Sequence, residues 1–469
     1  MPQSVDQAAY PLAPTYHDVL DMIGNTPLLE LKNLDTGPCR LFVKMELLNP
    51  ANSIKDRIAI AMVEAAEQAG TIKPGGQIIE ATAGNTGIAL AMVGAHKGYT
   101  VTVVMPDKMS LEKINHLRAM GAKVVLTRSD VEKGHPEYYH EVAARLAEET
   151  PNSVYVNQFA NEANVRAHYE ETGPEIWQQT EGRLDAFVAG VGSGGTLTGA
   201  GRYLREQHPD IDIVLADPQG SVLAPLVNEG KAVEPGFSLV EGVGEDFVPS
   251  ILDLEIVNKA YTIPDGESFH TCRDILRKEG ILCGTSSGTL VATALRYCRE
   301  QTEPKTVVTF LCDNGAKYLS KAFNDYWMID QGFIERETYG DIRDLIMRRH
   351  ADREDYTVDP DKPMSQAFKL MRMYDISQMA VLDKDDRIVG ILDESDLLMA
   401  ITHDEGCMKR PVSDFMTSRL ETIRPTASIN DLMPIFRADR VAIVVDDNGQ
   451  YHGLITKIDL ANYLRKQLP

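Results

Sequence analysis

The segment "NPANSIKDR" (49–57) stands at the start of an amphipathic pattern and determines how the surrounding chain is interpreted. Asn49-Pro50 favours a turn, and Ser53 occupies the position of a helix N-cap, with Asp56 three residues later. Lys55 falls in the first turn of the predicted helix, where the helix dipole disfavours a cation. Such a lysine is suited to be a neutral amine that forms an imine, although a solvated surface lysine is the alternative interpretation. Apolar residues then recur at the spacing of one buried helical face (Ile54, Ile58, Ala61, Met62, Ala65).

Strand and helix patterns alternate on both sides of this segment, from about residue 20 to residue 320. The predicted helices at 110–121 and 268–280 each end at a glycine. Several of the predicted strands are apolar on both faces, which indicates mainly parallel sheets covered by helices, and hence an α/β fold. In such a fold, ligands bind where the carboxyl ends of strands meet helix N-termini. The predicted strands are "CRLFVKM" (39–45), "GQIIEAT" (76–82), "YTVTVVMP" (99–106), "AKVVLT" (122–127), "LDAFVAGVG" (184–192), "IDIVLADP" (211–218) and "TVVTFLCDNG" (306–315).

Two strand-to-helix loops are rich in groups that bind anions. The loop 80–87, "EATAGNTG", offers backbone N–H groups and hydroxyls to a carboxylate or a phosphate; a tight loop with an N-cap is the alternative. The loop 190–196, "GVGSGGT", satisfies the dinucleotide pattern G-x-G-x-x-G. Its place late in the domain is unusual for that pattern, and Asp210 and Asp212 lie at the start of the next predicted strand rather than at its end. A phosphate cradle made by the amides of residues 192–196 is therefore favoured.

A third loop, "CGTSSG" (283–288), has the same strand-loop-helix context. Ser286 or Ser287 is predicted to cap the following helix. The other hydroxyl would then be available to a ligand.

From about residue 340 the sequence repeats itself. "AVLDKDDRIVGILDESDLL" (380–398) corresponds to "IVVDDNGQYHGLITKIDLA" (443–461), which aligns Gly390 with Gly453 and Asp396 with Asp459. Each copy has about sixty residues, enough for a small βαββα unit that needs its partner for stability. Residues 321–340 connect this tail to the first part of the chain.

Composition narrows the function classes. The 469 residues favour two or three domains, and the net charge of -22 makes nucleic acid and membrane surfaces poor partners. The six cysteines form no CxxC pair, so we predict reduced thiols and no metal site. The N-terminus does not have the pattern of a signal peptide, and no apolar run is long enough to span a membrane; a cytoplasmic location is expected.

These loops, in this order, resemble the fold type II (β-family) pyridoxal-phosphate enzymes over roughly residues 18–320. The motifs "IGNTPLLEL" (23–31), "NSIKDR" (52–57), "AGNTG" (83–87) and "GSGGT" (192–196) are similar to the cysteine synthase and cystathionine β-synthase branch, and the tail resembles a pair of CBS domains. The resemblance implies a catalytic core of two parallel-sheet lobes (1–330), a linker with the first CBS domain (331–405) and a second CBS domain (406–469). This domain order, with "DPQGS" (217–221) and "VEGVGEDFVPSILD" (240–253), resembles cystathionine β-synthase.

The resemblance also implies residue roles. Lys55 would form the Schiff base with pyridoxal 5′-phosphate, Asn85 would contact the pyridoxal 3′-oxygen, and Ser286 would contact the pyridine nitrogen. A neutral serine at that nitrogen favours β-elimination and replacement over transamination. The remaining implied residues are Gly192, Ser193, Gly194, Gly195 and Thr196 for the phosphate, and Thr82, Ala83, Gly84, Asn85, Thr86 and Gln158 for the amino-acid carboxylate.

The implied reaction is β-replacement on L-serine or O-acetylserine by L-homocysteine, giving cystathionine, with side reactions that release hydrogen sulfide. Cysteine synthase is the alternative, since "NQFANEAN" (157–164) is closer to that enzyme. A nucleotide-sensing protein with a non-catalytic core is the alternative of another class. We expect small amino-acid and thiol substrates and a homodimer or higher homo-oligomer. Heme is not expected, because the first 38 residues contain no cysteine.

The tail has one candidate ligand site. CBS-domain pairs often bind adenosyl ligands through the pattern G-h-h-[ST]-x-x-D, which the second repeat keeps from Gly453 to Thr456 and Asp459. The first repeat has Asp393 at the hydroxyl position, where it would repel a phosphate. We therefore predict that only the cleft with Thr456 and Asp459 accepts a nucleotide or S-adenosylmethionine. A tail that only stabilises an oligomer is the alternative.

Overall fold

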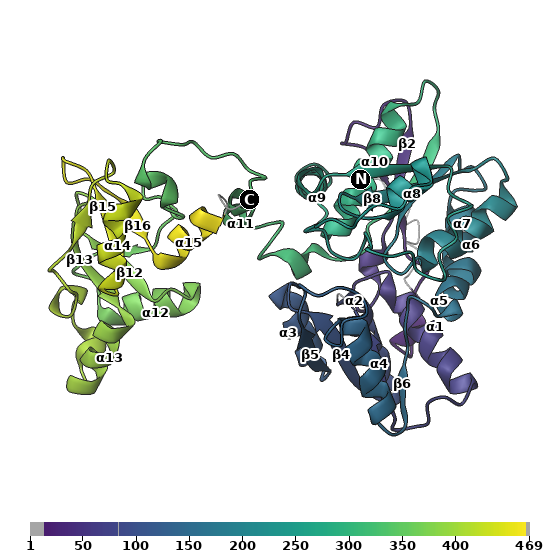
Figure 1. The fold of residues 1–469 in the computed structure, drawn as a ribbon, viewed down its shortest axis with the longest axis horizontal. Helices are drawn as coiled ribbons and strands as arrows, with labels where there is room; N and C mark the ends of the chain where they lie inside the picture. Colours follow the sequence, from purple (N-terminus) through teal and green to yellow (C-terminus); the bar gives the residue numbers. More distant parts are fainter. Residues whose placement is uncertain (1–13, 83, 466–469) are drawn as a thin grey trace, which may run out of the picture. The chain divides into compact units, whose positions relative to one another are not determined.

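Two mainly parallel sheets form the framework of the first of two units in the computed structural model, which describes residues 14–82 and 84–465 (Figure 1). The first unit ends at Met328 and the second begins at Ile329. Strand β1 pairs antiparallel with β2, and the other neighbouring strands of the two sheets are parallel. The larger sheet has the order β1 (Leu28–Leu31), β2 (Arg40–Lys44), β10 (Thr306–Phe310), β7 (Ala186–Gly190), β8 (Asp212–Pro218), β9 (Lys259–Ile263). The smaller has the order β5 (Lys123–Thr127), β4 (Thr100–Pro106), β3 (Gln77–Ala81), β6 (Ser153–Tyr155).

The expected α/β fold with parallel sheets is confirmed, and each of the seven predicted strands exists. In β4 and β8 all residues after the first are buried, as expected for strands covered on both faces. Strands β1, β6 and β9 were not predicted. β6 has three partly buried residues, so it is too short to produce a readable pattern.

Helices cover these sheets. The predicted helices at 110–121 and 268–280 are α3 and α9, although α9 begins three residues earlier than its apolar pattern suggested. The helix after Asn49-Pro50 is α1, and it begins at Lys55 with Ile54 as its N-cap. The predicted N-cap role of Ser53 is therefore wrong by one residue; its hydroxyl accepts the N–H of Lys55 at 3.3 Å instead. The helices are α1 (Lys55–Gln68), α2 (Asn85–Lys97), α3 (Leu111–Ala119), α4 (Tyr139–Glu149), α5 (Glu162–Ala167), α6 (Gly173–Gln179), α7 (Gly195–Gln207), α8 (Leu223–Glu229), α9 (Asp265–Glu279), α10 (Thr285–Arg299) and α11 (Asp325–Asp330).

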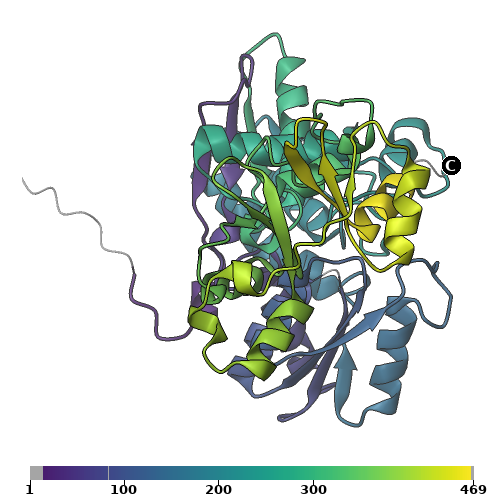
Figure 2. The same ribbon diagram turned by 90° about the vertical axis from the view of Figure 1, so that its left-hand side faces the viewer.

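The second unit contains two βαββα repeats, as predicted, which lie against each other in both views (Figures 1 and 2). A shared apolar cluster joins Ala380 and Leu382 of the first repeat to Ile443 and Tyr451 of the second. The first repeat comprises β11 (Thr357–Val358), α12 (Met364–Tyr374), β12 (Gln378–Leu382), β13 (Ile388–Asp393) and α13 (Glu394–His403). The second comprises β14 (Thr422–Ile423), α14 (Ile429–Arg437), β15 (Ala442–Val445), β16 (Tyr451–Ile455) and α15 (Lys457–Arg465).

The search of the described residues, 14–82 and 84–465, finds no helix with the length and apolar character that crossing a membrane requires. Each of the six cysteines is a free thiol.

A buried ion-pair network holds the first turn of α1. The guanidinium of Arg57 donates to Glu46 at 2.8 and 2.9 Å and to Glu175 of α6 at 2.7 and 2.8 Å. The side chains of Arg57 and Glu46 are fully buried. Burial alone would raise the pKa of Glu46, but Arg57, with smaller contributions from Thr26 and Lys44, outweighs burial and the pKa is lowered. The carboxylate therefore stays charged and binds α1 to the segment that follows β2.

Replacing Arg57 by methionine should strongly destabilise the first unit. The change leaves the buried Glu46 carboxylate without its counter-charge, which typically costs about 3–5 kcal/mol. Urea unfolding followed by tryptophan fluorescence measures this, because both tryptophans, Trp177 and Trp327, lie in the first unit. Arg128→Met is the control, since its ion pair with Asp130 is largely exposed and should contribute nothing measurable. A loss below about 1 kcal/mol in Arg57→Met would contradict the structural role of the network.

Candidate functional site

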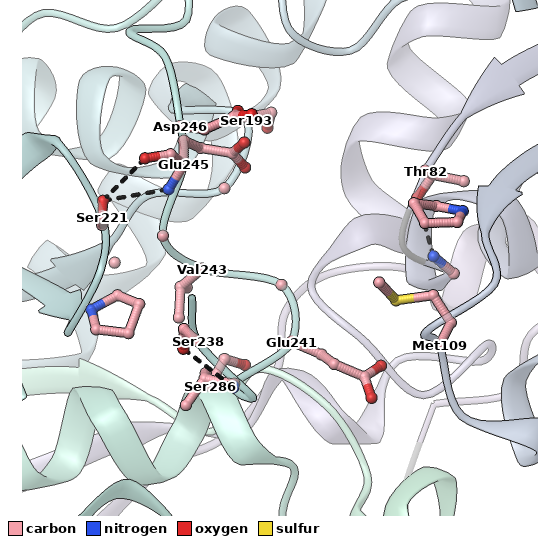
Figure 3. Close-up of a pocket in the computed structure, with 18 of the residues that line it drawn as sticks. Thr82, Met109, Ser193, Ser221, Ser238, Glu241, Val243, Glu245, Asp246 and Ser286 are labelled. Carbon is pink, nitrogen blue, oxygen red and sulfur yellow. Dashed lines mark hydrogen bonds between the residues drawn. The ribbon is translucent and has the colours of Figure 1, made fainter. Parts of the chain in front are cut away.

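A cavity of about 460 Å³ lies at the carboxyl ends of strands from both sheets. Its wall includes Thr82 after β3, Pro106 at the end of β4, Gly190 at the end of β7 and Pro218 at the end of β8. Figure 3 shows Thr82 and Met109 on one side and Ser193, Ser221 and the loop 238–246 on the other. This is where ligands bind in α/β folds, and it is the position that the sequence predicted.

Lys55, the first residue of α1, lines this cavity. Burial lowers the pKa of its amine, although Cys312, Glu245 and Asp313 oppose the shift. In the part of the chain that the structure describes, the amine forms no hydrogen bond or ion pair. Lys55 is thus not a solvated surface lysine. It is a partly buried amine, more easily deprotonated than an ordinary lysine, at the wall of the cavity.

The loop between β3 and α2 brings Thr82, Gly84, Asn85 and Thr86 to the cavity wall. The hydroxyl of Thr86 donates to Gln158 Oε1 at 2.8 Å, so Gln158 lies beside this loop as expected. Gly84 has a φ of +130°, and a Cβ there would lie 2.7 Å from Lys113 Cδ, so the turn into α2 requires glycine. Ala83, which the sequence also assigned to this group, lies outside the described residues.

The loop between β7 and α7 forms a second polar wall. Gly192, Ser193, Gly194 and Thr196 line the cavity, at the N-terminus of a helix that starts at Gly195. A Cβ at Gly195 would lie 1.9 Å from Asn164 Oδ1, so this residue packs against α5 and must be glycine.

The side chains of this loop are held by residues of α5 and of the turn after it. Asn164 Nδ2 donates to Ser193 Oγ at 2.9 Å, and His168 Nε2 lies 3.1 Å from Thr196 Oγ1. A glycine-rich turn at a helix N-terminus with two fixed hydroxyls has the donor set that a phosphate requires.

The dinucleotide alternative does not fit this geometry. Parallel pairing sets Ala186 beside Asp212, so Asp212 lies at the amino end of β8, at the opposite end from Gly190. Asp212 is bonded there to Tyr297 and, at 3.0 Å, to Lys305. Asp212 therefore lies at the end of β8 away from the cavity and cannot bind the ribose of a ligand there.

The serine loop differs from its expected capping role. Helix α10 begins at Thr285 with Gly284 as its N-cap, so neither Ser286 nor Ser287 caps it. The hydroxyl of Ser287 accepts the N–H of Cys312 at 2.9 Å. Ser286 lines the cavity and is only 4% exposed, which makes it the hydroxyl available to a ligand.

Several cavity residues were not predicted from the sequence. The loop before residue 247 contributes Glu241, Glu245 and Asp246. Glu241 bridges Lys113 and Lys321 at 2.7 Å each, and Lys113 with Lys321 holds its pKa low although burial opposes this. The pKa of Glu245 is raised well above its usual range, first by burial and then by Asp246. The sequence did contain a signal for these residues. The stretch "VEGVGEDF" (240–247), with two glutamates and an aspartate, is part of a family resemblance from which no residue roles were inferred.

In the second unit, the candidate ligand residues form helix caps. The N–H and Oγ1 of Thr456 donate to Asp459 Oδ2 at 2.7 and 2.6 Å, at the start of α15. Asp393 and Asp396 form the equivalent capping box at the start of α13. Asp393 and Thr456 are therefore the residues that precede α13 and α15, whereas Asp396 and Asp459 are the third residues of these helices and bond back to them. A ligand would have to share these groups with the helix starts.

The groups around the cavity in the first unit fit a cofactor that carries both a phosphate and an aldehyde. A buried amine, an amide-rich helix N-terminus and a buried hydroxyl face one space. The buried Asn164 Oδ1, which has no hydrogen-bond partner in the described residues, lies beside Gly195 of the loop between β7 and α7.

The class of protein follows from this arrangement and from family models. Residues 19–313 match the family "Pyridoxal-phosphate dependent enzyme", and residues 342–403 and 412–466 match the CBS domain. The fold and the site are those of a pyridoxal-phosphate-dependent enzyme with a tandem CBS module. Over nearly its whole length, the chain is also similar to curated proteins of one particular kind.

A cystathionine β-synthase of Apis mellifera is 35% identical over 463 residues, which cover 96% of this chain and 91% of that protein. The Saccharomyces cerevisiae cystathionine β-synthase is 34% identical over 508 residues, covering 96% and 98%. The chain belongs to the cystathionine β-synthase family.

Solved structures share the catalytic core. A hydrogen sulfide-producing enzyme from Fusobacterium nucleatum is 37% identical with a TM-score of 0.61, covering 65% of this chain and 100% of that chain. An O-ureido-L-serine synthase is 35% identical with the same TM-score of 0.61, covering 67% and 100%.

Proposed function

We propose that this chain uses pyridoxal 5′-phosphate to replace the β-substituent of L-serine or O-acetylserine with the thiol of L-homocysteine, which gives cystathionine. The observation that carries the proposal is that Lys55, the phosphate loop 192–196 and Ser286 line one cavity. Similarity to curated cystathionine β-synthases over 96% of the chain supports it. Hydrogen sulfide release from cysteine is the expected side reaction.

In this proposal the protein groups divide the work between them. Pyridoxal phosphate, when bound, draws electrons from Cα of an attached amino acid, so that the Cα proton becomes acidic and the β-substituent can leave. Lys55 would hold the cofactor, and its amine would take the Cα proton and later return it to the same carbon. A lowered pKa suits both tasks, because both need the neutral amine.

The remaining cavity residues bind and orient. Gly192, Ser193, Gly194, Gly195 and Thr196 would hold the phosphate through backbone N–H groups and two hydroxyls, and Ser286 would bond the pyridine nitrogen without protonating it. Asn85 would contact the 3′-oxygen. The substrate carboxylate would lie at Thr82, Gly84, Asn85 and Thr86, at the N-terminus of α2, and at Gln158, which accepts the hydroxyl of Thr86. Ala83 is proposed for the same group by sequence alone.

The position and the raised pKa of Glu245 favour an amino-acid thiol rather than sulfide as the second substrate. Glu245 lines the cavity near Lys55, and Ser221 fixes its backbone through bonds of 3.2 Å to its N–H and 3.3 Å to its carbonyl. Burial and the neighbouring Asp246 raise the pKa of its carboxyl, so an ammonium group would be a stabilising partner. Homocysteine brings such an ammonium and sulfide does not.

Lys55→Ala should fold but lose covalent cofactor attachment and essentially all turnover, because alanine is compatible with a helix start and cannot form an imine. The measurements are the visible absorption of bound cofactor, borohydride fixation, and product analysis with serine or O-acetylserine against homocysteine and sulfide. Cystathionine should be the main wild-type product. A tenth or more of the wild-type rate in Lys55→Ala would refute the assignment of Lys55. Cysteine as the main wild-type product would favour cysteine synthase instead.

Glu245→Gln should raise the KM for homocysteine about tenfold and leave the KM for sulfide nearly unchanged, because a charge-assisted bond to the ammonium is lost. Steady-state kinetics with each thiol measure this. Glu229→Gln is the control, because that carboxylate pairs with Lys231 on the surface and does not line the cavity within the described residues. An equal change in both KM values would show that Glu245 does not recognise the ammonium.

We further propose that the second repeat binds an adenosyl ligand, S-adenosylmethionine or a nucleotide, at Thr456 and Asp459. Burial raises the pKa of Asp459, and Arg348 is the charged group that opposes this shift. A cation beside the carboxylate and hydroxyl suits a ligand with a ribose and a phosphate. The equivalent position in the first repeat has Asp393, which would repel a phosphate.

Calorimetry of the full chain with S-adenosylmethionine, AMP and ATP should show one site per chain for at least one of them. Asp459→Ala should abolish that binding, and Asp396→Ala should leave it intact. The two variants are matched, because each removes a helix-capping carboxylate. Two sites per chain, or binding that survives Asp459→Ala, would refute the assignment. Silence from all three ligands would favour a purely structural tail.

Four other properties are proposed from sequence and family. Pyridoxal phosphate would be the cofactor without heme, so the holoenzyme would lack a Soret band. The protein would act in the cytoplasm as a homodimer or a higher homo-oligomer. Its partners would be small amino acids and thiols, since the charge of -22 disfavours nucleic acid and anionic membranes.

A further inference from the structure

Lys317 lies behind the wall of the cavity, in the short 3-10 turn Gly315–Tyr318 that follows β10. It is only 5% exposed and does not itself line the cavity. Its ammonium donates to Asn85 Oδ1 at 2.9 Å and to the carbonyl oxygens of Ala51 at 3.3 Å and Asn52 at 3.2 Å. One buried cation therefore joins the start of α2 to the turn that leads into Lys55.

The amide of Asn85 is held from its other end as well. Its Nδ2 donates to Asp313 Oδ2 at 2.8 Å, and the same oxygen accepts the hydroxyl of Tyr318 at 2.7 Å. A lysine ammonium can only donate and a carboxylate can only accept. The pair therefore permits one orientation of the amide, with Oδ1 toward Lys317 and Nδ2 toward Asp313.

This orientation determines what Asn85 offers to a ligand. The amide nitrogen carries two hydrogens, and Asp313 takes one of them. The second N–H remains for a group in the cavity that Asn85 lines. With the amide reversed, an oxygen would face Asp313 and an N–H would face the ammonium, which costs two charged contacts.

We infer that Lys317 is a positioning residue that, together with Asp313, fixes the Asn85 amide with an N–H available to the oxygen substituent of the cofactor ring. The inference rests on the proposed function, which assigns the cofactor to this cavity. It also accounts for a buried lysine that the proposed chemistry does not otherwise use.

The charge on Lys317 is part of this arrangement. Burial lowers the pKa of Lys317 to about 8; Lys113 of α3 adds to the shift, whereas Asp313 and Asp56 of α1 oppose it. His116 of α3 faces the same region, and burial with Lys317 lowers its pKa. Below about pH 8 the ammonium has three N–H groups for its three acceptors. Above that pH the neutral amine has two, so its hold on Asn85 weakens.

Titration of the full-length apo-protein with pyridoxal phosphate tests the inference, with the absorption band of the bound cofactor as a second readout. Lys317→Met should raise the Kd about tenfold or more at neutral pH and shift the band, because the Asn85 amide is free to reverse. In the wild type the Kd should also rise above about pH 8, where the ammonium of Lys317 titrates. In Lys317→Met this rise should be absent or smaller.

Lys44→Met is the matched control. Lys44 is also a buried lysine, with bonds to Thr26 and Gln179 and an ion pair with Glu175, and it lies away from the cavity wall. Its loss should lower stability without changing the Kd or the band. If Lys317→Met does not fold, Lys317→Arg decides the matter, because a permanently charged side chain should remove the alkaline rise in Kd.

The outcomes separate the two proposals. If wild-type protein binds pyridoxal phosphate and the Lys317 variants match it in Kd, band and pH profile, the inference is wrong and the proposed function stands. If Lys44→Met changes the Kd and the band as much as Lys317→Met does, loss of a buried charge is the cause and the inference is also wrong. If wild-type protein binds no pyridoxal phosphate, both the proposed function and the inference are wrong.

Discussion

The buried guanidinium of Arg57 holds the first turn of α1, and the position of Lys55 follows from it. Arg57 and Lys55 are two residues apart, so they leave the helix on different sides. Arg57 points into a network with Glu46 and Glu175, where burial makes any change of partner costly. Lys55 is left at the cavity wall, and no carboxylate within residues 14–82 and 84–465 is bonded to it. An ion pair with a carboxylate would favour the charged form of a lysine. A lysine that is to react as a neutral amine is therefore best placed where the nearby carboxylates pair with other cationic side chains.

The same principle extends around the cavity. Glu241 is neutralised by Lys113 and Lys321, and Asp313 is bonded to Asn85 and Tyr318. These pairs come from segments that are more than a hundred residues apart in several cases, such as Lys113 with Glu241. Local patterns contain no information about such pairs, and this is why the loops could be predicted from the sequence while Glu241, Asp313 and Lys317 could not. Strand ends and glycine-rich turns are local features, so "AGNTG" and "GSGGT" indicated the cavity correctly.

The roles of hydroxyl and carboxylate residues at helix starts could not be assigned from the sequence, because helix capping and ligand binding use the same groups. Ser286 and Ser287 were both candidates for the cap of α10, yet the helix begins one residue before Ser286 and uses Gly284. Ser53 was displaced from its expected cap in the same way, since Ile54 takes that position. Helix ends shift by one residue at little cost, and a shift of one residue decides whether a hydroxyl caps the helix or faces the cavity. The roles of such residues depend on backbone placement that the sequence pattern does not specify.

In the second unit, the segment that precedes each repeat packs into the apolar core of the other repeat. Ile342, Leu345 and Ile346, which come before the first repeat, are part of the apolar core of the second. Cys407 and Val412, which come before the second repeat, are part of the core of the first. The aligned glycines take part in this exchange: a Cβ at Gly453 would lie 2.5 Å from Ile346, and one at Gly390 would lie 2.3 Å from Met416. Each repeat is therefore completed by residues that lie outside its own alignment, and neither apolar core is complete without the segment that precedes the other repeat.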